Sequence, residues 1–218
     1  KLPLLMAKCY TLTVFIAVFF VLLFISFNSY TYAQVTATSS GYTPTELVED
    51  VLMGGSECVA VSKITYVGNG TARGYFSGGQ APLGFESGVI LASGDVANAN
   101  GPNNNGGTGS SFGGSGDGDL NILQTSSYST FDAAILEFDF VPTTNVATFN
   151  YVFGSEEYCE YSPSSFSDVF GFFISGPGIS GPFSNSAVNI ALIPGTSTAV
   201  SINNVNEITN TTYFIGNS

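Results

Sequence analysis

Apolar and polar residues alternate along much of this chain. In the run 134–141, Leu136, Phe138 and Phe140 share one face of an extended backbone. The other face carries Ile135, Glu137 and Asp139. A period of two predicts a β-strand with one buried face. A second alternating run, 146–153, follows after a short Pro- and Asn-containing turn, so we expect the two runs to form a hairpin.

Further short runs rich in β-branched and aromatic residues predict additional strands. The run 169–174 is almost entirely apolar, with a single glycine, and is also expected to be a strand. Many short strands separated by turns predict a mainly all-β fold, a β-sandwich or a jelly-roll-like arrangement. The remaining predicted strands are 59–67, 74–76, 88–92, 188–193 and 199–202.

One short helix is expected near the N-terminal end of this β-rich region. Thr43 can cap a helix, Pro44 suits its first position, and Glu46 completes a capping box. A helical stripe of apolar residues follows over 47–52, and two glycines then stop it.

The first 33 residues have the organisation of a secretory signal peptide. Met6 is a better candidate for the natural start than Lys1. Lys8 then precedes an apolar run over 12–27, and Ala33 is a small residue at which cleavage is expected. The alternative is an uncleaved anchor, although the apolar run is shorter than the ~20 residues that span a bilayer.

Removal of that segment leaves a strongly acidic chain. All 16 acidic residues lie beyond Ala33, and only Lys63 and Arg73 oppose them, so the net charge becomes −14. Such a charge repels phosphate backbones, which disfavours nucleic acid as a partner. The chain also has no histidine, so the Ser-His-Asp and Cys-His catalytic arrangements are absent. Oxygen donors remain, and these suit calcium.

Two cysteines, Cys58 and Cys159, remain after the predicted cleavage. In an exported chain they predict one disulfide that closes a long loop. The alternative is two separate buried thiols.

Several segments taken together resemble the choice-of-anchor L domain. The most specific are VFGSEEY at 152–158 and DVFGFFISGPG at 168–178, in that order with a short spacer. The other segments that carry the resemblance are 46–48, 59–66, 88–95, 134–142, 149–157 and 189–196.

The resemblance implies an exported bacterial domain that is secreted or held at the cell surface. Members of this family carry different C-terminal sorting or anchoring signals, and none is recognised here. The expected organisation is a signal peptide at 1–33, a short linker at 34–42 and the β domain at 43–218. The strands that the family usually has after the segment 202–206 are expected to be missing. Membrane contact is expected only through the signal segment or a missing anchor.

Three carboxylates, Glu156, Glu157 and Glu160, cluster around Cys159 and raise the question of catalysis. Glu156 and Glu157 are adjacent, so on a strand they would face opposite sides. A glycosidase needs two carboxyl groups across ~5–9.5 Å, which adjacent positions do not supply. We therefore predict no enzymatic activity. Two carboxylates facing a ring-lined groove in space would favour the enzyme.

Calcium is the expected cofactor. The stretch 117–121 begins like an EF-hand loop but lacks its glycine and its final glutamate. A long loop is predicted over 93–121. Within it, the stretch 117–121 is either part of a different calcium site that uses distant acids or a solvated Asp/Gly turn. The candidate metal ligands are Asp95, Asp117, Asp119, Glu156, Glu157 and Asp168.

The sequence thus predicts a non-catalytic structural or adhesive module at the cell surface. It would bind a partner protein or a glycan, with calcium ordering a loop. The alternative is a carbohydrate-active module, either glycan-binding or a glycoside hydrolase that uses carboxylates.

Overall fold

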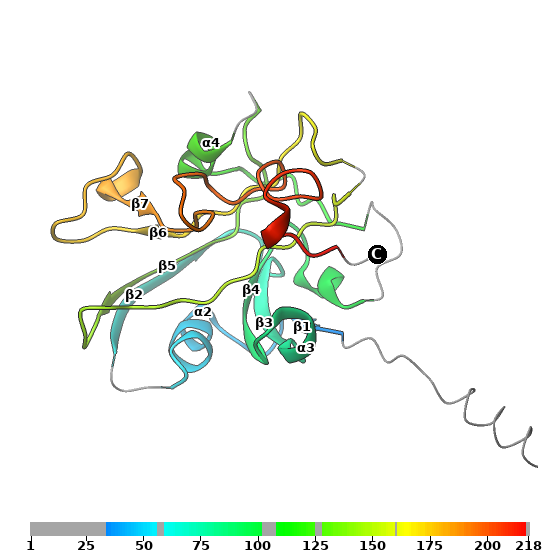
Figure 1. Cartoon of the computed structure of the whole chain (residues 1–218). Coiled ribbons are helices and arrows are strands. Elements are labelled where there is room, and N and C mark those ends of the chain that lie inside the picture. Colours follow the sequence, from blue (N-terminus) through cyan, green and yellow to red (C-terminus); the bar gives the residue numbers. More distant parts are fainter. Residues whose placement is uncertain (1–33, 56–58, 102–107, 125–127, 160, 217–218) are drawn as a thin grey trace, which may run out of the picture. The chain divides into compact units, whose positions relative to one another are not determined.

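The computed structural model describes residues 34–55, 59–101, 108–124, 128–159 and 161–216 (Figure 1). Internal contacts divide the chain after Ala33, and the described residues belong to the unit Gln34–Ser218. The predicted signal peptide, 1–33, lies outside the described residues. No helix in the described part of the chain is long and apolar enough to cross a membrane.

The strands are short and pair antiparallel in three small sheets, which confirms the mainly-β prediction (Figure 1). One sheet has the order β1-β3-β4, the second pairs β2 with β5, and the third pairs β6 with β7. The strands are β1 (Thr36–Thr38), β2 (Ala60–Val67), β3 (Arg73–Ser77), β4 (Ser87–Leu91), β5 (Ile135–Val141), β6 (Phe173–Ile174) and β7 (Val188–Asn189).

The predicted N-terminal helix is present. It consists of α2 (Pro44–Glu46), which continues as a π-helical turn, η1 (Leu47–Leu52). Thr43 and Glu46 form the expected capping box, in which the Thr43 N–H donates to Glu46 Oε2 at 2.7 Å. Short helical turns also occur at α3 (Gln80–Leu83), η2 (Val96–Ala99), α4 (Gly118–Leu123), η3 (Ser184–Ser186) and η4 (Thr211–Tyr213).

Strand β5 has the predicted facing. Leu136, Phe138 and Phe140 are half-buried, whereas Glu137 and Asp139 are exposed. A half-polar strand buries its apolar side against the protein and leaves the other side in water.

The partner of β5 is nevertheless β2 and not the run 146–153, so the predicted hairpin is wrong. A tight hairpin requires residues with positive φ in its turn. No residue between Pro142 and Val146 has a positive φ. The side chain of Thr144 instead bonds to Val146, with its hydroxyl donating to the carbonyl at 2.7 Å.

Strand β2 carries an irregularity where it faces β5. Ser62 pairs with Asp139 and Thr65 pairs with Glu137, so β2 contains one extra residue. Lys63 adopts a φ of 51° in this β-bulge, and its ammonium lies 2.6 Å from Asp139 Oδ2.

The predicted apolar strand 169–174 is reduced to β6, and none of its residues is fully buried. The reason lies in Asn189. Its Oδ1 accepts hydrogen bonds from the N–H groups of Phe172 and Ala191, both at 3.0 Å, and so replaces ladder bonds with a side chain.

The buried apolar side chains come from two stretches of sequence. The first stretch includes Leu47 and Val48, which are fully buried, and extends to Val96. The second stretch lies between Ala187 and Val205. The aromatic side chains of the segment 138–173, which lies between the two stretches, are buried less completely.

Candidate functional site

Residues 147–153 form an extended segment that is held by its rings. The ring centroid of Phe149 lies 4.9 Å from that of Phe172 and 6.2 Å from that of Phe140. Both contacts are edge-on, which is a favourable geometry for aromatic pairs. The ring of Phe149 therefore attaches the segment to Phe140 and Phe172.

Tyr151 and Phe153 continue this attachment on Phe170, with centroid distances of 5.2 Å and 6.4 Å. Partial burial raises the pKa of the Tyr151 phenol. Between these rings, Asn150 and Val152 remain exposed, the latter to 52 %.

The backbone of the same segment is unpaired. Within the described part of the chain, no N–H or C=O group of residues 147–153 makes a hydrogen bond. Extended backbone with free donors and acceptors has the properties of an edge strand.

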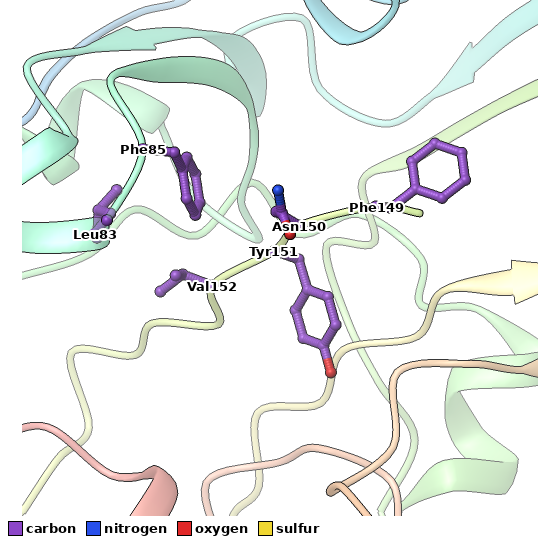
Figure 2. A pocket seen from close by; sticks show the side chains of 7 residues that line it. Leu83, Phe85, Phe149, Asn150, Tyr151 and Val152 are labelled. Atoms are coloured by element: carbon purple, nitrogen blue, oxygen red, sulfur yellow. The ribbon is translucent and has the colours of Figure 1, made fainter. Parts of the chain in front are cut away.

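A depression of about 470 Å³ adjoins this segment. Figure 2 shows Leu83 and Phe85 on one wall and the residues 149–152 on the other. Leu83 ends α3, and the chain then turns through Gly84, which has a φ of 85°. Among the described residues, Asn150 supplies the only side-chain amide of the lining, and no carboxylate lines the depression.

The carboxylate-rich turn follows directly after this segment. Ser155 Oγ donates to Asp168 Oδ2 at 2.6 Å and accepts from the Glu157 N–H at 3.1 Å. Burial raises the pKa of Glu157, and the nearby charge of Asp168 raises it further. Glu157 Oε2 is buried and receives no hydrogen bond from the described residues.

The next residues tie the turn to the C-terminal loops. Tyr158 Oη donates to the Val205 carbonyl at 2.6 Å, and Ser162 Oγ donates to the Ile202 carbonyl at 2.8 Å. Burial, followed by the charges of Asp168 and Glu207 and by Cys159, raises the pKa of Tyr158 to about 12. The phenol is therefore neutral across the physiological range.

Asn206 organises the loop on the other side of this contact. It is fully buried, and its Nδ2 donates to the carbonyls of Ile202 and Asn203 at 2.9 and 3.2 Å. Its Oδ1 accepts from the N–H groups of Ile208 and Thr209 at 3.0 and 2.7 Å. One side chain thus satisfies four backbone groups.

Three of the six predicted metal ligands accept hydrogen bonds from backbone N–H groups. Asp95 accepts from the Ala97 N–H, and Asp117 caps α4 by accepting from the Leu120 N–H, both at 2.9 Å. Both oxygens of Asp119 accept from the Ser184 N–H, at 3.1 and 3.0 Å.

The other three acids, Glu156, Glu157 and Asp168, lie in or near the turn at 156–159. Burial raises the pKa of Glu157 and the charge of Asp168 raises it further, whereas burial alone raises the pKa of Glu156. Among the described residues, no three acidic or cysteine side chains converge on one point. Of the six candidates, the structure therefore brings together the pair Glu157 and Asp168.

The predicted disulfide remains a prediction. Cys58 lies outside the described residues. Cys159 is exposed on the turn that follows Tyr158.

Asp132 has a role that the sequence does not predict. Its carboxylate accepts hydrogen bonds from the N–H groups of Phe112 and Gly114 and from the hydroxyl of Ser111. Burial opposes ionisation of Asp132 most strongly, but these bonds together lower its pKa. Asp132 thus anchors the 108–117 part of the expected long loop. No spacing marks it, because its partners are backbone groups about 20 residues away.

Comparison with known families decides the identity of this fold. The model of the choice-of-anchor L domain matches residues 34–218. The chain belongs to this family. As a choice-of-anchor L domain, it is a module of an exported, surface-anchored protein, and its family is not typically catalytic. No match was found among curated proteins or among solved structures.

Proposed function

We propose that this choice-of-anchor L domain is a non-catalytic adhesive module that binds a partner protein or a glycan at the cell surface. The observation that supports this proposal is the depression between Leu83–Phe85 and the segment 149–152. Apolar walls with a few polar groups are typical of binding sites. Here the lining combines rings and aliphatic side chains with the amide of Asn150 and exposed polar groups of the backbone.

The second candidate is a carbohydrate-active module, which either binds glycans or hydrolyses them. The lining includes the rings of Phe85 and Tyr151 and the amide of Asn150, a combination of groups that suits a sugar. Hydrolysis is less well supported, because a glycosidase would need two carboxylates beside the rings. The lining of the depression contains none.

Binding measurements on single-site variants test the adhesive role. Immobilised protein would be exposed to a panel of surface polysaccharides and purified surface proteins. We expect Phe85→Ala and Tyr151→Ala to weaken binding at least about tenfold, the loss that follows from removing a central aromatic anchor. Tyr213→Ala is the matched control, because Tyr213 is an exposed ring outside the depression.

Equal binding by all four proteins would exclude the depression as the binding site. Cleavage of the polysaccharides by the unaltered protein, with loss of that cleavage in Asp168→Ala, would replace the adhesive role with a hydrolytic one.

Calcium is part of the same proposal, at Glu157 and Asp168. Two carboxylates and the hydroxyl of Ser155 are oxygen donors of the kind that calcium prefers. A cation would also compensate the buried Glu157 Oε2, which has no hydrogen-bond donor among the described residues. Calcium needs six to eight ligands, so backbone carbonyls or water would complete the site.

Thermal unfolding with calcium and with chelator tests this part. We expect calcium to raise the Tm of the unaltered protein and to leave that of Asp168→Ala unchanged. An unchanged Tm of the unaltered protein in calcium and in chelator would exclude the site.

A further inference from the structure

We propose that the open edge of residues 147–153 accepts an extended strand from a partner protein. The strand would have an uncharged, alternating centre and basic residues at its ends. This inference rests on the proposed binding function and names the kind of partner.

The first argument is the state of the backbone. Residues 147–153 are fixed by ring contacts of Phe149, Tyr151 and Phe153, while none of their backbone groups is hydrogen-bonded within the described residues. A fixed and extended backbone is already in the conformation that a ladder needs. Strand addition therefore requires little loss of conformational entropy from residues 147–153.

The second argument is the absence of protection along this edge. Natural edge strands are blunted by lysines, prolines or other charges. The stretch 143–155 contains no charged residue and no proline. Its length of seven residues at 147–153, at about 3.3 Å per residue, also suits an ordinary strand.

The third argument is space. The depression of about 470 Å³ lies beside 149–152, with Leu83 and Phe85 on the opposite wall (Figure 2). An added strand would project alternate side chains toward these two apolar residues. Pockets for alternate side chains are the usual source of specificity in strand addition.

Charge decides the occupant. The chain beyond Ala33 carries a net charge of −14, so a second copy of it would be repelled. Glu156 follows the uncharged stretch, and the exposed Glu86 comes directly after Phe85, whereas Asp139 before the stretch is paired with Lys63. The carboxylates of Glu156 and Glu86, in a chain with a net charge of −14 beyond Ala33, favour a strand with basic ends.

The test uses synthetic peptides of about nine residues, with alternating valine and threonine and a lysine at each end. Two further versions are N-methylated, one at the odd backbone nitrogens and one at the even ones. In an antiparallel or parallel ladder only every second N–H of a strand faces its neighbour. We expect one methylated version to lose binding and the other to retain it.

Hydrogen exchange supplies the second measurement. Peptide binding should slow exchange of amides within 147–153 by about tenfold or more, and glutamates in place of the terminal lysines should weaken binding by about tenfold. The control protein is Tyr213→Ala, which should behave as the unaltered protein does.

Four outcomes would overturn the strand proposal. Two concern the peptides: no binding at millimolar peptide, or equal loss or equal retention of binding by both methylated versions. The other two are a dimer of this protein whose own 147–153 amides are protected, and polysaccharide binding without slower exchange of these amides. The two proposals fail separately. Suppose that Phe85→Ala abolishes adhesion while the two methylated peptides bind equally. The depression then binds a partner, but not by strand addition.

Discussion

The hydroxyl of Tyr158 donates a hydrogen bond of 2.6 Å to the backbone carbonyl of Val205. This contact joins the most recognisable segment of the family to a loop 47 residues later in the chain. The ring of Tyr158 also packs edge-on against Phe214, with 5.0 Å between the centroids. The carboxylate-rich turn is thus held from the side of the C-terminal loops.

Replacement of this hydroxyl should destabilise the protein. We expect Tyr158→Phe to lower the free energy of unfolding by about 1–3 kcal/mol, because the Val205 carbonyl loses its donor. Denaturant unfolding measures this change. Tyr213→Phe, which removes an exposed hydroxyl, should change stability by less than ~0.5 kcal/mol. An equal effect of the two substitutions would contradict the role of the Tyr158 bond.

The titration of Tyr158 is a separate prediction. Its phenol should ionise near pH 12, well above the ordinary value for tyrosine, and ultraviolet absorbance would follow this ionisation. The absorbance change of the unaltered protein minus that of Tyr158→Phe isolates the residue. Ionisation near pH 10 in this difference would show that Tyr158 is not shielded from solvent.

Glu157 should make stability depend on pH in an unusual direction for a carboxylate. Its pKa is raised in the folded protein, so its favourable contribution is complete below the unfolded value of 4.5 and is lost as pH rises through the folded value. Without calcium, Glu157→Gln should therefore be more stable than the unaltered protein at neutral pH, and the difference should vanish in acid.

Calcium should reverse this ranking if it binds Glu157 and Asp168. The glutamine variant would then be the less stable protein at neutral pH, as followed by thermal unfolding. Glu207→Gln is a suitable control, because Glu207 is exposed and lies outside the proposed ligand pair. A Glu157→Gln variant less stable than the unaltered protein in chelator would contradict the predicted sign.

Asp132 should show the opposite pH dependence. Its pKa is lowered, so its contribution is present above the unfolded value of 3.8 and is lost as pH falls through the folded value. Asp132→Asn should lower protection of the Phe112 and Gly114 amides from hydrogen exchange at neutral pH. The unaltered protein should lose that protection in acid. The control is Asp117→Asn, which affects α4 and should leave the Phe112 and Gly114 amides protected.

Asn206 offers the largest expected effect of a single substitution. Asn206→Ala leaves four backbone groups without their partner in a buried site, which should cost roughly 2–4 kcal/mol in denaturant unfolding. Asn145→Ala is the matched control, because Asn145 is exposed. Similar stability of the two variants would show that water replaces the lost amide.

Local patterns predicted local structure well. The capping box at Thr43 and Glu46 needs residues three positions apart, so the sequence contains all of it. The same holds for the buried face of β5, since alternation depends only on neighbouring residues. These features involve no choice between distant partners.

The choice of partners could not be predicted in the same way. The run 146–153 alternates as a strand does, yet within the described residues the backbone of 147–153 makes no hydrogen bond. Strand β5 pairs instead with β2, which precedes it by some 70 residues. Asn189 and Asp132 bond to distant backbone groups, and any Asn or Asp has the chemistry to do so. Of the predicted metal ligands, the structure brings Glu157 and Asp168 together, whereas Asp95 and Asp117 cap nearby helical turns. Asp119 accepts instead from the distant Ser184 N–H.

The bulge at Lys63 has a consequence for how the length of β2 can vary. Val61, Ile64 and Tyr66 all point inward, although the first two are three positions apart. The extra residue absorbs that mismatch on the solvent side, where Lys63 meets Asp139. A deletion at position 63 would leave Val61, Ile64 and Tyr66 in strict alternation. Position 63 is thus a point at which this strand can lose one residue while both of its halves keep their inward faces.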